Sequence, residues 1–295
     1  MALTDPEIPV IASIKDLGSR YAAWVVDIWG VMHNGHRAFA PAIEAIRSFR
    51  EEGGIVVFLS NSPRPTPGVQ EQLARLGVPA TCYDATVTSG DLTRHELGKH
   101  RHPRVFHLGP ERDLPIFAGL DMTLVPRDKA ELVVCSGLFD DETETPQEYV
   151  GLLRELAARH LPMICANPDH LVERGHKLVY CAGALAAIYE KEGGSVVYAG
   201  KPYPPIYELA HETIAGIAGR AVSKGEILAV GDGVHTDIAG AGGFGIDAVF
   251  VASGLHAPTN SGGEAGQEAL DRMHLAELFG QAKRRPLAAM RALVW

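Results

Sequence analysis

The sequence predicts an α/β protein with a parallel-sheet, Rossmann-like core and a second α/β domain inserted into that core. Short apolar runs such as Ala23–Ile28 lack polar alternation, which is typical of parallel strands covered on both faces. Longer segments with helical spacing separate these runs. The middle of the chain repeats the same alternation by itself, and 295 residues suffice for roughly two domains.

The core elements follow one another along the chain. After the first strand, Pro41–Glu52 is predicted to be a helix because its apolar residues recur on one helical face. A second buried strand, Ile55–Leu59, follows, and the next helix ends near Leu76-Gly77. Three later apolar runs are assigned to the same sheet: Ser195–Ala199, Ile227–Val230 and Ala248–Val251.

The middle of the chain supplies its own strands and a helix. Thr145-Pro146, with a glutamate close behind, is a helix start signal for Pro146–Arg159. We therefore expect a core domain made of residues 1–82 and 184–295, and an inserted α/β cap domain made of residues 83–183. The predicted strands of the cap are Arg104–Leu108, Leu132–Cys135 and Met163–Ala166.

Composition and charge exclude several classes of protein. The formal net charge of -9 argues against a nucleic-acid binder, which would need a basic surface. The longest uncharged apolar run, about Leu178–Tyr189, is shorter than the ~20 residues of a membrane span. The first residues do not have the pattern of a signal peptide. Four widely spaced cysteines fit reduced thiols, so we expect a cytoplasmic protein.

Polar residues gather where the predicted core strands end, and in a doubly wound sheet chemistry collects at that edge. A carboxylate, a hydroxyl, a lysine and an acidic pair at one site are what phosphoryl transfer through an aspartyl-phosphate requires. Oxygen ligands beside a substrate phosphate favour Mg²⁺. The strand-end residues are Asp27, Ser60-Asn61, Gly200-Lys201-Pro202, Asp232 and Asp237.

The order and spacing of these segments resemble the haloacid dehalogenase-like (HAD) superfamily, and specifically its NagD-like (class IIA) branch with a large α/β cap. The resemblance runs from about Ala22 to Gly254. The first motif is D-x-W-G-V with Gly35 beyond it, and Ser60-Asn61 is the second. GKPYPPIYELA and GDGVHTDIAGA are the third and fourth motifs, and TSGD, ANPD and GALAAIYEKEGG are cap signatures.

The resemblance implies a role for each matching residue. Asp27 would be the nucleophile and a metal ligand, together with the backbone carbonyl of Trp29. Asp232 would bind Mg²⁺, and Asp237 would order the water around it. In the phosphate-binding group, Ser60 and Asn61 would hold the transferring phosphoryl group and Lys201 would balance its charge.

Trp29 departs from the D-x-D pattern that phosphatases of this superfamily usually show. The second Asp of that pattern serves as general acid and base, and an indole cannot exchange a proton at neutral pH. Such groups typically contribute about 10²- to 10⁴-fold. The sequence therefore predicts a slow phosphatase, a substrate with a good leaving group, a replacement acid such as His33 or His235, or loss of turnover.

The leading hypothesis is a Mg²⁺-dependent phosphatase of a small phosphorylated metabolite, such as a sugar phosphate or a nucleotide. Asn167 and Asp169 in the cap could select this substrate, although turn chemistry explains them equally well. A non-catalytic protein that binds phosphorylated ligands is the alternative, and a dehalogenase fits less well because it needs no metal. A homodimer stays open. The glycines of G-x-G-x-x-G at Gly240 close a helix instead of opening one, which argues against dinucleotide binding.

Overall fold

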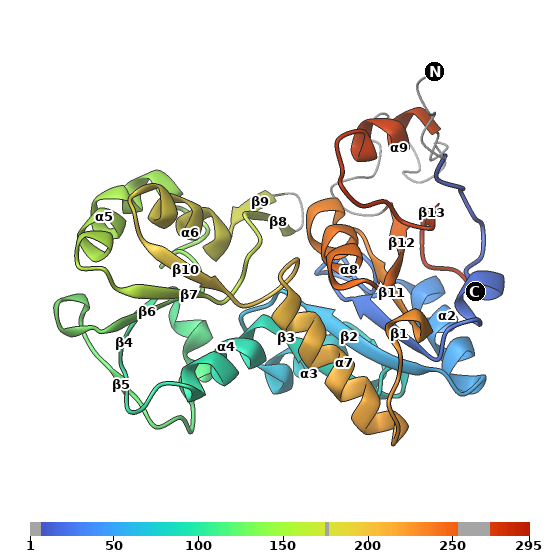
Figure 1. Cartoon of the computed structure of the whole chain (residues 1–295), viewed down its shortest axis with the longest axis horizontal. Coiled ribbons are helices and arrows are strands. Elements are labelled where there is room, and N and C mark those ends of the chain that lie inside the picture. The colour runs from blue at the N-terminus through green and yellow to red at the C-terminus, as the bar shows by residue number, and fades with distance from the viewer. Residues whose placement is uncertain (1–6, 175–176, 253–271) are drawn as a thin grey trace. The chain divides into compact units, whose positions relative to one another are not determined.

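A computed structural model describes residues 7–174, 177–252 and 272–295. The chain divides into two compact units (Figure 1), which we call the core unit and the cap unit. The core unit comprises Met1–Leu59, Ala74–Ala85 and Ala210–Trp295, and the cap unit comprises Ser60–Leu73 and Thr86–Leu209. The predicted domain boundaries at residues 83 and 183 are a different division, and they stay a proposal.

The first sheet has six strands in the order β13-β12-β11-β1-β2-β3. Strand β1 pairs in parallel with β2 on one side and with β11 on the other. The chain thus winds in both directions from β1, and the β1/β11 boundary is the switch point at which such sheets open a crevice. The strands are β1 (Ala23–Asp27), β2 (Ile55–Ser60), β3 (Ala85–Thr88), β11 (Ile227–Gly231), β12 (Asp247–Val251) and β13 (Ala288–Met290).

Burial explains why the first of these strands forms. All five residues of β1 are buried, including its last residue, Asp27. The indole of Trp24 stacks on Phe49 with ring centroids 4.0 Å apart, and its Nε1 donates to the Gly18 carbonyl at 3.2 Å. Phe49 belongs to helix α2 (Ala40–Glu51), whose buried face also contains Ala42, Ala45 and Ile46. This i, i+3, i+4, i+7 spacing is the amphipathic pattern that the sequence indicated.

Further helical segments of the core unit follow its strands or join it to the cap unit. The residues Val234–Ile238 after β11 form a single turn of π-helix, a type of turn that is frequent at functional sites. Helix α7 (Pro204–Ala218) and helix α3 (Thr66–Arg75) each contain residues of both units. The remaining α-helices are α1 (Lys15–Gly18), α8 (Ala239–Phe244) and α9 (Arg272–Phe279).

The cap unit contains a five-stranded parallel sheet in the order β10-β7-β6-β4-β5. Buried Leu153, Leu156, Leu185 and Tyr189 pack against it from helices α5 and α6. An antiparallel hairpin, β8–β9, stands apart from this sheet. The strands are β4 (Arg104–Leu108), β5 (Thr123–Leu124), β6 (Leu132–Cys135), β7 (Pro162–Cys165), β8 (Leu171–Arg174), β9 (Lys177–Tyr180) and β10 (Ser195–Tyr198), and the α-helices are α4 (Ser89–Gly98), α5 (Val150–Ala158) and α6 (Ala182–Lys191).

The predicted fold class is confirmed, and so are the predicted strands, within a residue at each end. One grouping was wrong: Ser195–Tyr198 pairs with β7 of the cap sheet and not with the core sheet. The predicted helix at Pro146 begins with a 3-10 turn, Pro146–Tyr149, before α5. Its start signal is confirmed, since Thr145 and Glu148 form a capping box. The sequence analysis missed the short strands β3, β5, β8, β9 and β13.

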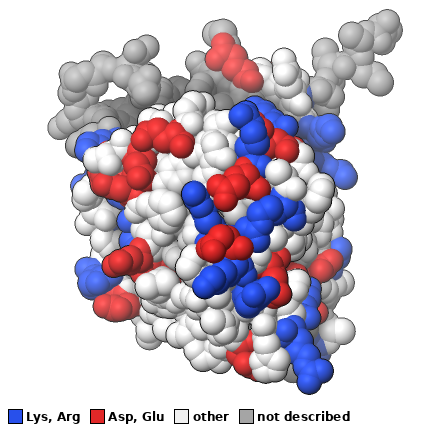
Figure 2. Space-filling model, turned by 90° about the vertical axis from the view of Figure 1, so that its left-hand side faces the viewer, with Lys and Arg blue, Asp and Glu red and all other residues white. Residues whose placement is uncertain are grey.

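Charge on one face, helix length and the state of the thiols can be described directly. On the face in Figure 2, acidic and basic side chains are interspersed, with no broad region of one sign among the described residues. Within the described part of the chain, no helix is both long and apolar enough to cross a membrane. All four cysteines are free and buried.

The packing of the cap predicts the effect of removing one core side chain. Leu153 is completely buried, so Leu153→Ala should lower the free energy of unfolding of the cap by about 2–5 kcal/mol through lost burial and an added cavity. Leu124 on β5 is 44% exposed, and Leu124→Ala should change it by less than about 0.5 kcal/mol. Urea unfolding followed by circular dichroism measures both, and equal losses would contradict the packing described.

Candidate functional site

Three aspartates meet at the carboxyl end of the core sheet. Asp27 is the last residue of β1, Asp232 follows β11, and Asp237 lies in the π-helical turn after it. One carboxylate oxygen of each lies within 4.8 Å of those of the other two. The arrangement follows from the parallel pairing of β1 with β11, which makes both strands end at the same edge. Asp27 and Asp237 are buried, and Asp232 is half-buried.

Glycines allow the backbone to close around these carboxylates. Gly30 has φ +86°, and a Cβ there would lie 2.0 Å from Asp232 Oδ2. A Cβ on Gly231 would lie 2.3 Å from Asp237 Cγ. Residues 30 and 231 must therefore lack side chains for the aspartates to approach one another.

Asp237 is oriented by its own turn. Its Oδ2 accepts a hydrogen bond from the Gly233 amide at 3.1 Å and another from Thr236 Oγ1 at 3.2 Å. These two donors hold one carboxylate oxygen of Asp237 in place.

The donor set suits a hard divalent cation. Carboxylate oxygens are the ligands that Mg²⁺ and Ca²⁺ prefer, and buried like charges this close repel unless a positive charge is present. Asp27, Asp232 and Asp237 are therefore the residues that could hold such an ion.

Trp29 and His33 lie together in the tight turn after β1. Their rings meet edge to face with centroids 5.0 Å apart, and the Gly30 amide donates to the His33 carbonyl at 2.8 Å. A Cβ on Gly35 would lie 2.6 Å from Trp29 Cη2, so the indole fills the space above that glycine. The Trp29 side chain thus lies close to both His33 and Gly35.

The two histidines considered as replacement acids differ in their surroundings. His33 is 2% exposed, and its burial lowers its pKa to about 4. Its Nδ1 accepts from the Gly35 amide at 3.0 Å, which assigns the ring proton to Nε2. His33 is therefore a neutral donor at pH 7. His235 is exposed in the π-helical turn.

The predicted phosphate-binding residues belong to the cap unit. Ser60 ends strand β2, directly after Leu59, whose partner in register is Asp27. Asn61 contacts two other predicted residues: its Nδ2 donates to the Lys201 carbonyl at 3.0 Å and to Asp169 Oδ1 at 2.9 Å. Asn61 and Lys201 are buried.

Asn167 shapes the turn that presents Asp169. Its Oδ1 accepts from the Asp169 amide at 3.1 Å, and Asn167 is also buried. The sequence analysis missed Ser89, whose hydroxyl donates to Asn61 Oδ1 at 3.4 Å. Ser89 lies in the TSGD segment, and this position is the one feature of the sequence that could have indicated its role.

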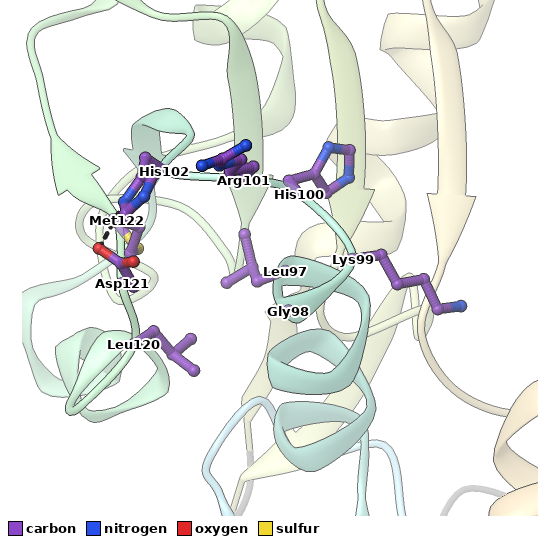
Figure 3. Close-up of a pocket in the computed structure, with 9 residues that line it drawn as sticks. All are labelled: Leu97, Gly98, Lys99, His100, Arg101, His102, Leu120, Asp121 and Met122. Atoms are coloured by element: carbon purple, nitrogen blue, oxygen red, sulfur yellow. Dashed lines mark ion pairs between the residues drawn. The ribbon is translucent and has the colours of Figure 1, made fainter.

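A separate hollow of about 320 Å³ lies in the cap unit at the end of α4 (Figure 3). None of the predicted site residues lines it. His102 and Asp121, which both line it, form an ion pair at 2.7 Å, while Lys99 and His100 point away from Asp121. Its polar rim is exposed, and we assign it no role.

Comparison with known proteins agrees with the fold. Residues 24–123 match a family model described as haloacid dehalogenase-like hydrolase, and residues 198–276 match a HAD-hydrolase-like model. The crystal structure of a haloacid dehalogenase-like hydrolase from Brucella suis 1330 is 46% identical, with TM-score 0.85 over 97% of this chain and 100% of that chain. The 4-nitrophenylphosphatase of Thermotoga maritima shares the fold at 23% identity, with TM-score 0.67 over 92% of this chain and 95% of that one.

Curated relatives are more distant, and several are named as a nucleotidase or a phosphatase. 5'-Nucleotidase YutF of Bacillus subtilis is 28% identical over 80% of this chain and 88% of its own length. Human chronophin is 27% identical over 77% of this chain and 79% of its own, and the sugar-phosphatase AraL of Bacillus subtilis is 25% identical over 79% and 84%. With its inserted parallel α/β cap and its phosphatase relatives, the chain belongs to the haloacid dehalogenase-like hydrolases, in the class IIA branch typified by NagD, p-nitrophenylphosphatase and chronophin.

Proposed function

We propose that the protein is a Mg²⁺-dependent phosphatase that hydrolyses a small phosphorylated metabolite through an aspartyl-phosphate on Asp27. The observation that carries the proposal is the meeting of Asp27, Asp232 and Asp237 at the switch point of the core sheet. The names of the relatives support a nucleotide or a sugar phosphate as the class of substrate.

In the proposed reaction Asp27 acts twice. Its carboxylate oxygen attacks phosphorus, and the bond between phosphorus and the ester oxygen breaks as the alkoxide leaves and is protonated by solvent. Water then attacks phosphorus of the acyl phosphate and gives up a proton to solvent, which releases inorganic phosphate and restores the carboxylate. Bound Mg²⁺ would neutralise charge on the phosphoryl oxygens. Its holders would be Asp27, the Trp29 carbonyl and Asp232, with Asp237 ordering the water around the ion.

The charges of the phosphoryl group need a second set of partners. We assign binding of its oxygens to the Ser60 hydroxyl and the Lys201 ammonium, with Asn61 beside them. Asn167 and Asp169 form the turn that we propose to affect substrate choice. Ser60 directly follows Leu59, which is the register partner of Asp27. In the proposed site, the Ser60 hydroxyl and the Asp27 carboxylate therefore come from the ends of neighbouring strands.

The indole of Trp29 makes proton donation to the leaving group the weak step. No proton can come from this side chain, and His33 is neutral at pH 7. The proposed enzyme therefore favours esters whose alcohol leaves without a proton, and His235 stays the alternative proton donor. Cytoplasmic location and a homodimer stay predictions.

The nucleophile is tested by release of inorganic phosphate. With Mg²⁺, the wild type should hydrolyse members of a panel of phosphomonoesters that includes nucleotides, sugar phosphates and p-nitrophenyl phosphate. A chelator or Asp27→Asn should abolish turnover, because either change removes part of the attacking or charge-neutralising machinery. A wild type that releases no phosphate from any ester would favour a non-catalytic binding protein.

The metal site is tested by calorimetric titration with Mg²⁺. Asp232→Asn removes one anionic ligand and should weaken binding at least about tenfold. Asp247 lies on β12 of the same sheet and accepts a hydrogen bond from Tyr21 at 2.7 Å, so Asp247→Asn serves as the control and should bind Mg²⁺ like the wild type. Unchanged affinity in Asp232→Asn would remove this residue from the site.

The consequence of Trp29 is tested by varying the leaving group. Trp29→Asp should raise the rate on alkyl phosphates by up to about 10²- to 10⁴-fold, because it supplies a general acid. The rate on p-nitrophenyl phosphate should change little, since nitrophenolate leaves unprotonated. Trp29→Asn controls for the smaller side chain and should show no such gain. Equal behaviour of the two variants would mean that another group already donates the proton.

A further inference from the structure

The side-chain amide of Asn61 is fully engaged by protein groups. Its Nδ2 uses both hydrogens, on Asp169 Oδ1 and on the Lys201 carbonyl. Its Oδ1 accepts from the Lys201 amide at 2.7 Å and from Ser89 Oγ at 3.4 Å. A primary amide offers two donors and two acceptor lone pairs, so these four contacts use all of them. Asn61 is also 4% exposed, which leaves its amide poorly suited to bind phosphate directly.

The contacts with Lys201 pair both of its backbone groups. Asn61 accepts from the amide of Lys201 and donates to its carbonyl, as a neighbouring β-strand would. A lysine side chain is long and flexible, so the position of its ammonium depends on where its backbone is held. Asn61 therefore fixes the base of the Lys201 side chain, which is itself 3% exposed.

The turn before Lys201 has no room to shift. A Cβ on Gly200 would lie 2.3 Å from Ser89 Oγ, 2.6 Å from Asn61 Oδ1 and 2.6 Å from Pro168 Cδ. Three segments distant in the sequence thus close on this turn from different sides. These are the end of β2, the start of α4 and the ANPD loop.

The loop that holds Asp169 is also packed closely, against the start of α6. The Gly183 amide at the start of α6 donates to the Asp169 carbonyl at 3.1 Å. A Cβ on Gly183 would lie 2.1 Å from the Pro168 carbonyl oxygen, so helix and loop are in close contact. Asp169 consequently presents a fixed acceptor to Asn61.

We infer that Asn61 is a positioning residue for Lys201, and that Asp169 and Ser89 hold Asn61 in the orientation this requires. The inference rests on the proposed role of Lys201 in binding the phosphoryl group, and it revises the roles proposed for Asn61 and Asp169. It also gives the TSGD and ANPD segments of the cap a shared purpose, the alignment of a lysine that neither segment contains.

A double-mutant cycle tests whether Asn61 acts through Lys201. Displacing a binding group by about 1 Å can cost about 100-fold, so Asn61→Ala should lower kcat on p-nitrophenyl phosphate by about that factor. The Kd for inorganic phosphate, measured by calorimetry in Mg²⁺, should rise. In a Lys201→Ala background the same substitution should change both quantities by less than about twofold, since no ammonium remains to be positioned.

Two substitutions of Asp169 test its hydrogen bond with Asn61. They also keep the inference testable if Asn61→Ala does not fold. Asp169→Asn keeps an oxygen acceptor for Asn61 Nδ2 and should retain most of the wild-type kcat and phosphate affinity. Asp169→Ala removes the acceptor and should lower both. The matched control is Gln72→Ala, which deletes a side-chain amide that accepts from Arg64 at 3.2 Å in the same unit. Its kcat and phosphate Kd should equal those of the wild type.

Failure of this inference is separable from failure of the proposed function. A wild type that turns over no ester fails the proposed function, and the phosphate Kd then tests the positioning alone. Equal effects of Asn61→Ala with and without Lys201 would overturn the inference, because they would mean a general loss of structure. Unchanged phosphate affinity in Asn61→Ala, or a wild type that binds no phosphate, would overturn it too.

Discussion

Three carboxylates within 4.8 Å of one another are the constraint around which the core of this protein is built. Their mutual repulsion has to be met by positive charge, since two of the three are buried and poorly screened by water. Parallel pairing of β1 with β11 brings Asp27 and Asp232 to one edge, and glycines at residues 30 and 231 remove the side chains that would keep them apart. The same crowding that is unfavourable for folding suits these three carboxylates to a divalent cation, and the proposed reaction depends on that cation.

The positively charged group of the proposed site, Lys201, is held in place by hydrogen bonds. Lys201 is buried in the cap unit, and its backbone is held by the side chain of a residue 140 positions away. Asn61 in turn depends on Asp169 and Ser89, which come from two cap segments. In the proposed enzyme, the strand order of the core sheet brings the carboxylates together. The TSGD and ANPD segments of the cap align one lysine through hydrogen bonds.

The sequence was most informative where local pattern and sheet geometry agree. Continuous apolar runs identified the buried strands. Because the carboxyl ends of parallel strands meet at one edge of a sheet, Asp27, Asp232 and Asp237 could be expected together. Ser195–Tyr198 was assigned to the wrong sheet because an apolar run looks the same whichever sheet accepts it. The saturated amide of Asn61 could not be predicted, because its partners lie 28, 108 and 140 residues away and only the folded chain brings them together. Trp29 was visible from the start, whereas its packing against His33 was not.

The most direct test of the account is to trap the phosphorylated enzyme. Wild-type protein would be mixed with substrate and Mg²⁺, quenched in acid within milliseconds and reduced with borohydride, which converts an aspartyl-phosphate into homoserine. Peptide mass spectrometry should then find homoserine at residue 27 alone, and none after incubation with chelator. Homoserine at another aspartate, or turnover without any trapped residue, would contradict the assignment of Asp27 as the nucleophile.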